Sequence, residues 1–178
     1  MTGFPLDDTQ ESDGSGQIRW QGNQTIGRRL DQLADYLVIG GMEELHVTHY
    51  RRLAYAISRW PESMEALRHE GRLKQIPSIG PTIQHMVQQL VDTGSCDKWQ
   101  EWAQRVPESA LDLAAIPGVG VKTVRSLFMD YGIDGLPALQ RALDAHRLAD
   151  LQGIGPKTVV RIRRHLEARA RGEVEVSR

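Results

Sequence analysis

Hydrophobic residues recur at helical intervals along most of the chain. The first stripe places its members on one face of an α-helix. It consists of Ile26, Leu30, Leu33 and Leu37. We expect this helix to begin near Asn23 or Thr25, which are good capping residues, and to end at Gly40 and Gly41.

The same periodicity predicts helices along the rest of the chain. They follow stripes from Val47 to Ile57 and from Ile83 to Val91, and they cover 63–69, 97–105, 108–115, 121–131, 137–149 and 156–170. Pro61, Gly71 and Gly94 end three of them. No run alternates between apolar and polar residues for long enough to predict a pair of strands. The expected fold class is therefore all-α.

Composition divides the chain into segments. Residues 1–20 are rich in Gly, Ser, Asp and Thr and have no apolar period, so we predict a disordered acidic tail. We expect two small helical subdomains over 21–95 and 96–171, with a boundary near 93–97 and a C-terminal tail over 172–178. Trp99 and Trp102 are expected to be core anchors that join the two halves.

Three short turns that close on glycine interrupt the helical pattern. They read Ile-Pro-Ser-Ile-Gly at 76–80, Ile-Pro-Gly-Val-Gly at 116–120 and Leu-Gln-Gly-Ile-Gly at 151–155. Glycine lets the backbone turn tightly and approach another molecule closely. A helix N-terminus follows each turn and presents free N–H groups with a partial positive charge, which suits a phosphate. The pattern is typical of the helix-hairpin-helix motif, which binds the DNA backbone without reading sequence.

The alternative is that these glycines only end one helix and begin the next. The second position of each following helix is Thr82, Lys122 or Lys157, a hydroxyl or a cation, which favours phosphate binding. The predicted DNA-binding residues are Ser78, Ile79, Gly80, Gly118, Val119, Gly120, Lys122, Gly153, Ile154, Gly155 and Lys157. Four arginines either border the same surface or form a solvated helix face: Arg161, Arg163, Arg164 and Arg169.

Charge is distributed unevenly in this chain of 178 residues, whose formal net charge is −1. Residues 1–20 have a net negative charge, so the rest of the chain has a net positive charge. Lys and Arg outnumber Glu in 151–178. This asymmetry suits a DNA partner better than the total does.

Few side chains are suited to a metal or a disulfide. Cys96 is the single cysteine, which excludes an intramolecular disulfide and a Cys-based zinc site. His46 and His49 have the spacing of a metal-binding pair but no further ligand beside them, so solvated or packing roles are favoured. No apolar run approaches the roughly 18 residues of a membrane span. We expect an intracellular, cytoplasmic or nucleoid-associated protein with no membrane partner.

From about Asn23 to about Leu166, the order of these segments resembles the N-terminal half of the family X DNA polymerases, small gap-filling repair enzymes. The matching segments are 33–37, 50–54, 71–73, the first two turns, 90–94, 131–133 and 148–155. The resemblance implies a lyase-like domain followed by the DNA-binding fingers region. The polymerase palm would begin after residue 170, and the chain stops at Arg178, so we expect no polymerase activity.

The resemblance also bears on the deoxyribose-phosphate lyase activity of the family's first domain. That reaction needs a lysine amine to form a Schiff base. The family's nucleophilic lysine falls on Met86, and two other pocket lysines fall on Thr82 and His46. Residues that still match the 5′-phosphate pocket are Tyr50, Lys74 and Lys98. We therefore expect that the chain has no catalytic residue. The alternative is a weak lyase in which Lys74 is the nucleophile.

The resemblance further implies a Na⁺ or K⁺ ion on hairpin carbonyls, and no other cofactor. In the first hairpin these carbonyls belong to Lys74, Ile76 and Ile79, and in the second to Ala114, Ile116 and Val119. The expected function is sequence-independent DNA binding in repair, with gapped or nicked DNA and its 5′-phosphate preferred. The alternative function, which does not involve DNA, is that of a protein-interaction scaffold. A repair protein is expected as a further partner.

Overall fold

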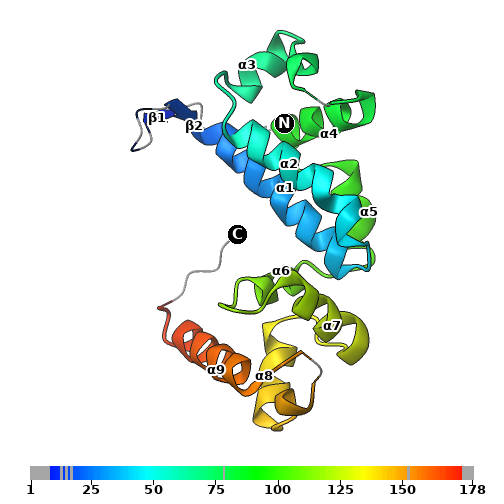
Figure 1. Cartoon of the computed structure of the whole chain (residues 1–178), viewed down its shortest axis with the longest axis vertical. Helices are drawn as coiled ribbons and strands as arrows, with labels where there is room; N and C mark the ends of the chain where they lie inside the picture. The colour runs from blue at the N-terminus through cyan, green and yellow to red at the C-terminus, as the bar shows by residue number, and fades with distance from the viewer. Residues whose placement is uncertain are drawn as a thin grey trace. The chain divides into compact units, whose positions relative to one another are not determined.

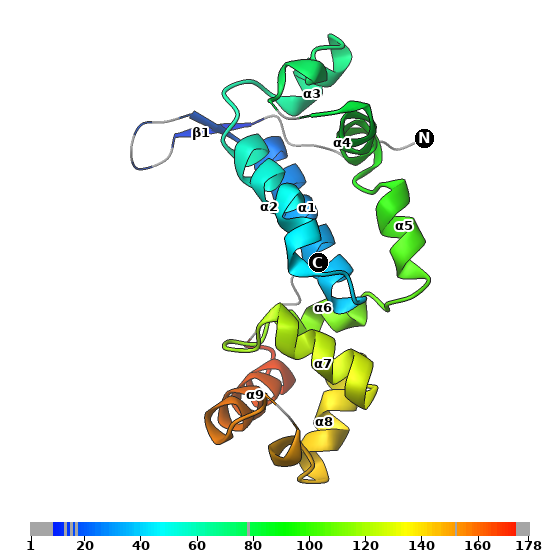
Figure 2. The same ribbon diagram turned by 45° about the vertical axis from the view of Figure 1, so that its right-hand side comes forward.

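The computed structural model describes residues 9–12, 14, 16, 18–77, 79–151 and 153–173. Helices dominate this part of the chain, which confirms the predicted all-α class (Figures 1 and 2). They are α1 (Gln21–Ile39), α2 (Glu44–Ser58), α3 (Met64–His69), α4 (Pro81–Thr93), α5 (Asp97–Ala103), α6 (Ser109–Ala114), α7 (Val121–Tyr131), α8 (Leu136–Asp144) and α9 (Pro156–Ala170). Two 3₁₀ turns cover Leu73–Gln75 and Leu148–Asp150. None of the helices in the described residues is long and apolar enough to cross a membrane.

A small antiparallel hairpin precedes α1. Strand β1 (Gln10–Ser12) pairs with β2 (Ile18–Trp20). The expectation of no strand pair, and of disorder throughout 1–20, is wrong for these two strands; residues 1–8 lie outside the described part. Strands of three residues are too short to show a period of two. Tertiary contact holds the hairpin, because the Trp20 indole N–H donates to the Pro61 carbonyl at 3.0 Å.

The described residues fall into two compact units. The first contains residues up to Ala34 and from Leu45 to Trp102, and the second contains 35–44 and the residues from Ala103 onward. The division therefore falls after Trp102 rather than near 93–97. Trp99 belongs with the first unit, where the Arg29 guanidinium lies 5.7 Å from its ring centroid and the indole is buried.

The first unit is built on α1 and α2, which lie side by side in Figures 1 and 2. α1 begins at Gln21, so Asn23 lies inside the helix and is not its cap. Asn23 is only 1% exposed, and its Oδ1 accepts the Met64 N–H at 2.8 Å. Its amide group donates to the carbonyls of Trp60 and Glu62 at 3.3 and 2.9 Å. This side chain fastens the turn between α2 and α3 to α1.

The second unit packs the end of α1 against the C-terminal helices. The Tyr36 hydroxyl is buried and donates to the Val106 carbonyl. α8 ends at Asp144 instead of continuing to 149, because His146 adopts a left-handed conformation with φ of 56°. The His146 and Arg147 N–H groups then donate back to the carbonyls of Leu143 and Ala142, each at 3.0 Å, in the pattern of a helix C-cap.

Candidate nucleic-acid interface

The last glycine of each predicted turn is the N-cap of the following helix, in nearly the same backbone conformation. The φ and ψ angles are −79° and 170° at Gly80, −79° and 163° at Gly120, and −80° and 166° at Gly155. These values are ordinary for any residue. A Cβ atom built on any of the three glycines would meet no atom within 4 Å.

Neither the backbone nor the packing of this chain therefore requires glycine at these three N-caps. Ser, Thr, Asp or Asn would cap the helices at least about as well. Because glycine nevertheless occurs at all three equivalent N-caps, we infer that another molecule approaches the backbone closely there and that a side chain would obstruct it.

The middle glycines have a different role. Gly118 and Gly153 have φ of +81° and +84°, which disfavours any residue with a Cβ. Each is the third residue of a turn that closes when the fourth residue donates its N–H to the first. Val119 donates to the Ile116 carbonyl at 2.9 Å, and Ile154 donates to the Leu151 carbonyl at 3.1 Å. The structure of the turn explains these two glycines. Ser78, at the corresponding place in the first turn, lies outside the described residues.

The residue between the two glycines points inward. The side chains of Val119 and Ile154 are buried and anchor the second and third turns in the core, and Ile79 is half-buried. Of the predicted DNA-binding residues, these three can therefore meet a ligand chiefly through their backbone.

Free backbone donors gather at the start of each following helix. The first intrahelical bond of α7 runs from the Val124 N–H to the Gly120 carbonyl at 3.0 Å, which leaves the earlier amides without an intrahelical acceptor. α4 and α9 carry proline at their first position, where α7 has Val121 with its N–H. The second hairpin therefore offers more free donors than the first, which lacks an N–H at its first position, and than the third, where the Thr158 N–H also bonds to the Gly155 carbonyl at 2.9 Å.

Cationic side chains lie near the second and third hairpins. Lys122 is 76% exposed and pairs with the Glu44 carboxylate at 2.7 Å. An exposed pair of this kind contributes about 0–1 kcal/mol, so an incoming phosphate can replace the carboxylate. Lys157 is exposed near the start of α9.

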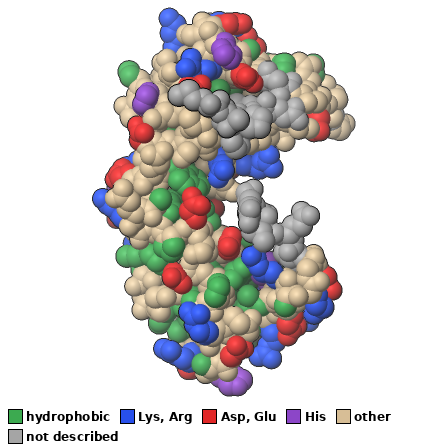
Figure 3. Space-filling model, turned by 180° about the vertical axis from the view of Figure 1, so that it is seen from behind, with side chains coloured by type: hydrophobic (Ala, Val, Ile, Leu, Met, Phe, Trp, Pro, Cys, Tyr) green, Lys and Arg blue, Asp and Glu red, His purple; other side chains and the backbone are tan. Residues whose placement is uncertain are grey.

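Arg161 lies at the tip of the second hairpin, although it comes from α9. A Cβ atom on Gly118 would overlap its Nη1 and lie 3.1 Å from its Cδ and Cζ. Arg163 instead faces α8, so the four arginines of this helix do not share one surface. Figure 3 shows basic and acidic side chains mixed over the face that it draws. The sequence predicted that Arg161 either borders the hairpin surface or lies on a solvated helix face, and its contact with Gly118 favours the first alternative.

Two of the three residues predicted for a 5′-phosphate pocket, Tyr50 and Lys98, have an acidic neighbour in common. Burial raises the pKa of the Tyr50 phenol, and Cys96 and Glu101 raise it further. The Lys98 ammonium bonds to the Glu101 carboxylate at 3.2 Å. Tyr50 and Lys98 thus share Glu101 as a neighbour, a carboxylate that opposes a phosphate and that sequence reasoning missed. Lys74 is exposed, and a pocket that joins it to the other two stays a prediction.

The position aligned with the lyase nucleophile lies in the core. Met86 is 6% exposed on α4, which confirms its interpretation as a packing residue. Thr82 and His46 are exposed. The His49 ring contacts Tyr50 with centroids 3.9 Å apart. Within the described residues, no group of three His, Cys, Asp or Glu side chains is arranged to hold a metal ion.

The carbonyls predicted to hold a monovalent cation remain a prediction. The Ile116 carbonyl accepts the Val119 N–H, and an acceptor with two lone pairs retains one for a cation.

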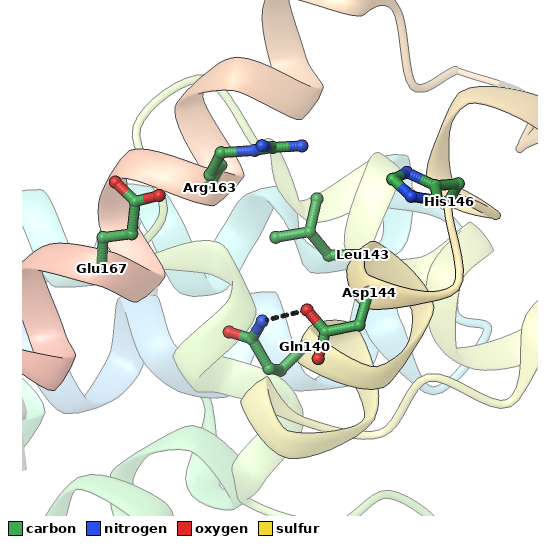
Figure 4. A pocket seen from close by; sticks show the side chains of 6 residues that line it. All are labelled: Gln140, Leu143, Asp144, His146, Arg163 and Glu167. Atoms are coloured by element: carbon green, nitrogen blue, oxygen red, sulfur yellow. Dashed lines mark hydrogen bonds between the residues drawn. The ribbon is translucent and has the colours of Figure 1, made fainter.

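A cavity of about 290 Å³ lies between α8 and α9 (Figure 4). Its lining includes two carboxylates, Asp144 and Glu167, and two basic groups, His146 and Arg163. Figure 4 shows Arg163 extending toward the side of His146, with Glu167 on the other side of Arg163. The Gln140 amide donates to Asp144 at 2.8 Å. Because two carboxylates line it and would repel an anion, this cavity is not a candidate for a phosphate.

Comparisons with known proteins agree with this geometry. Residues 21–96 match a family described as a helix-hairpin-helix domain, and residues 110–168 match one described as a SAM-like helix-hairpin-helix tandem. The DNA polymerase/3′-5′ exonuclease PolX of Bacillus subtilis (strain 168) is 23% identical over 137 residues. The chain resembles the helix-hairpin-helix region of a family X DNA polymerase. The match covers 77% of this chain and 24% of PolX, so the chain spans about a quarter of that relative. Its helix-hairpin-helix regions indicate DNA binding.

Proposed function

We propose that this chain binds the phosphate backbone of DNA without reading its sequence, and that the second and third hairpins make the principal contacts. The observation that carries the proposal is the set of N-cap glycines Gly80, Gly120 and Gly155, which share one conformation and have open space where a side chain would stand. A phosphate oxygen needs this space to reach the backbone amides.

The charged side chains support the second hairpin as the strongest site. It combines the extra N–H of Val121 with the Arg161 guanidinium over Gly118 and with Lys122. On binding, Lys122 exchanges the Glu44 carboxylate for a phosphate. These contacts go to phosphates and carry no sequence information.

The proposed role is in DNA repair, as a binding protein that recognises gaps or nicks and their 5′-phosphates without catalysing a reaction. The similarity to PolX supports a role alongside a DNA polymerase. The buried thioether of Met86 supports the absence of lyase chemistry, because it cannot form an imine. A Na⁺ or K⁺ ion on the hairpin carbonyls, and an intracellular location, are parts of the same proposal.

The test is binding of the full chain to gapped, nicked and intact duplexes over a salt series. If two or three phosphates are neutralised, log K should fall against log salt with a slope of about −2 to −3. At physiological salt, Kd for intact duplex should be roughly 10⁻⁴ to 10⁻⁶ M. A gap should strengthen binding. Failure to bind any of the three at low salt would contradict the proposal and favour the protein-interaction scaffold.

A further inference from the structure

A groove of about 670 Å³ runs between α1 and α2 in the first unit. It contains none of the hairpin residues. Its lining includes Arg19, Gln24, Arg28, Arg51, Tyr55 and Arg59. The site is therefore separate from the interface described above.

Gly27 explains why the two helices approach closely here. A Cβ atom at Gly27 would lie 2.9 Å from the Ala54 carbonyl oxygen and 3.0 Å from the Ser58 Cβ. The φ of Gly27 is not in the left-handed region, so packing rather than backbone conformation accounts for the glycine. With the helix backbones in close contact, the long side chains on either side become the walls of the groove.

The groove is strongly basic. Four arginines line it against a single carboxylate, that of Asp31. Asp31 lies 4.0 Å from the Arg51 guanidinium, with both side chains partly exposed, so the pair is weak and the groove retains a net positive charge. All four cations are guanidinium groups, whose planar fork matches the oxygens of a phosphate.

An aromatic platform stands beside these charges. The Tyr55 side chain is 63% exposed, although it is large and apolar. The Arg59 guanidinium carbon lies 3.8 Å from the Tyr55 ring centroid, within the range of a cation–π contact. An exposed ring stacked with a guanidinium offers a flat surface on which a nucleobase can stack.

We propose that this arginine groove, defined by Arg19, Arg28, Arg51, Tyr55 and Arg59, binds an unpaired DNA strand. The guanidinium groups hold successive phosphates, and one base stacks on the Tyr55–Arg59 platform. A paired base is already stacked within its duplex and cannot use the platform, which is why the ligand is an unpaired strand. The proposal rests on the proposed function in that both require DNA binding, but it uses different residues.

The experiment measures binding of the full chain to a short oligothymidylate and to a blunt duplex over a salt series. Arg51→Gln should weaken strand binding and reduce the steepness of its salt dependence by about 0.7, the share of one phosphate on a single strand. Arg52→Gln is the matched control, because Arg52 is exposed on the same helix and does not line the groove. Neither variant should change duplex binding.

Stacking is tested separately. Tyr55→Ala should weaken oligothymidylate binding roughly fivefold or more, the effect of one base–aromatic contact. It should not weaken binding of a sugar-phosphate strand that lacks bases. Tyr131→Ala, which removes an exposed tyrosine from α7, serves as the control.

The hairpin variant Gly120→Asp with Gly155→Asp separates the two proposals. It should weaken duplex binding and leave the affinity for oligothymidylate unchanged. If the wild-type chain binds neither probe, the proposed function fails. If duplex binding responds to the hairpin variant while strand binding is the same in Arg51→Gln and Arg52→Gln, only the groove proposal is overturned. Polyglutamate serves as a probe for an acidic protein. If Arg51→Gln loses polyglutamate binding but keeps oligothymidylate binding, the groove proposal is overturned and the ligand of the groove is an acidic protein.

Discussion

Placing aspartate at two hairpin N-caps separates a binding role of these glycines from a structural one. The variant is Gly120→Asp combined with Gly155→Asp. Both positions have N-cap backbone angles and room for a side chain. Aspartate is a better N-cap than glycine by a few tenths of a kcal/mol, and its charge gains about 0.3–1 kcal/mol from the helix dipole. The variant should therefore be as stable as the wild-type chain, or more stable.

DNA binding should change in the opposite direction. A carboxylate about 4 Å from a phosphate is repelled by about 1 kcal/mol in bulk water and about 4 kcal/mol at an effective dielectric constant of roughly 20. The same carboxylate also accepts the amide hydrogens that the phosphate would use. Each hairpin should thus lose at least roughly fivefold in affinity, since about 1.4 kcal/mol corresponds to a factor of ten.

The assay pairs fluorescence anisotropy on a labelled duplex with a thermal melt. Gln100→Glu with Gln104→Glu adds the same two negative charges at exposed positions that do not belong to the hairpins, and it corrects for the change in net charge. Equal duplex affinity in the hairpin variant and this control would refute the reasoning, because the two glycines would then have only a structural role. A large fall in melting temperature would refute the assignment of these glycines as replaceable N-caps.

The other predictions concern an ion pair, a buried amide and the lost nucleophile. Glu44→Gln should raise duplex affinity slightly, because it releases the lysine that pairs with Glu44 for a phosphate; a weaker complex in the same titration would contradict this role. Asn23→Leu should lower the free energy of unfolding by about 1–3 kcal/mol in urea titrations, because it leaves the buried Met64 N–H without its acceptor, and an unchanged midpoint would contradict it. Borohydride reduction with an abasic-site substrate should trap no adduct on the wild-type chain, and a trapped adduct lost in Lys74→Ala would show a lyase that does not need Met86.

Local signals predicted most of the helices. The limits of α7 and α9 coincide with the expected 121–131 and 156–170, because glycine or proline marks each start and the apolar stripe is long. The expected helix 63–69 is shorter by one residue, because Ser63 is the N-cap of α3, with its Oγ accepting the Ala66 N–H at 3.3 Å.

Several of the features that sequence reasoning missed depend on distant contacts. Asn23 looked like a cap because its three partners lie beyond α2 and give no local signal. The arginines between α1 and α2 likewise come together only when the helices pack. Sequence offered Arg161 as a residue that borders the hairpins, but its contact with Gly118 depends on the fold. Sequence showed that the hairpins close on glycine, but only the structure separates the glycines that the turn needs from those it does not.

The open N-caps also make the chain a convenient object for site-specific labelling. The native thiol, Cys96, is buried, and burial raises its pKa, so it should resist alkylation by reagents that attack thiolates. Cysteine introduced at Gly80, Gly120 or Gly155 would stand in open space on an undistorted backbone. A fluorophore or spin label could therefore be attached to one hairpin at a time, and each would report on its own encounter with DNA.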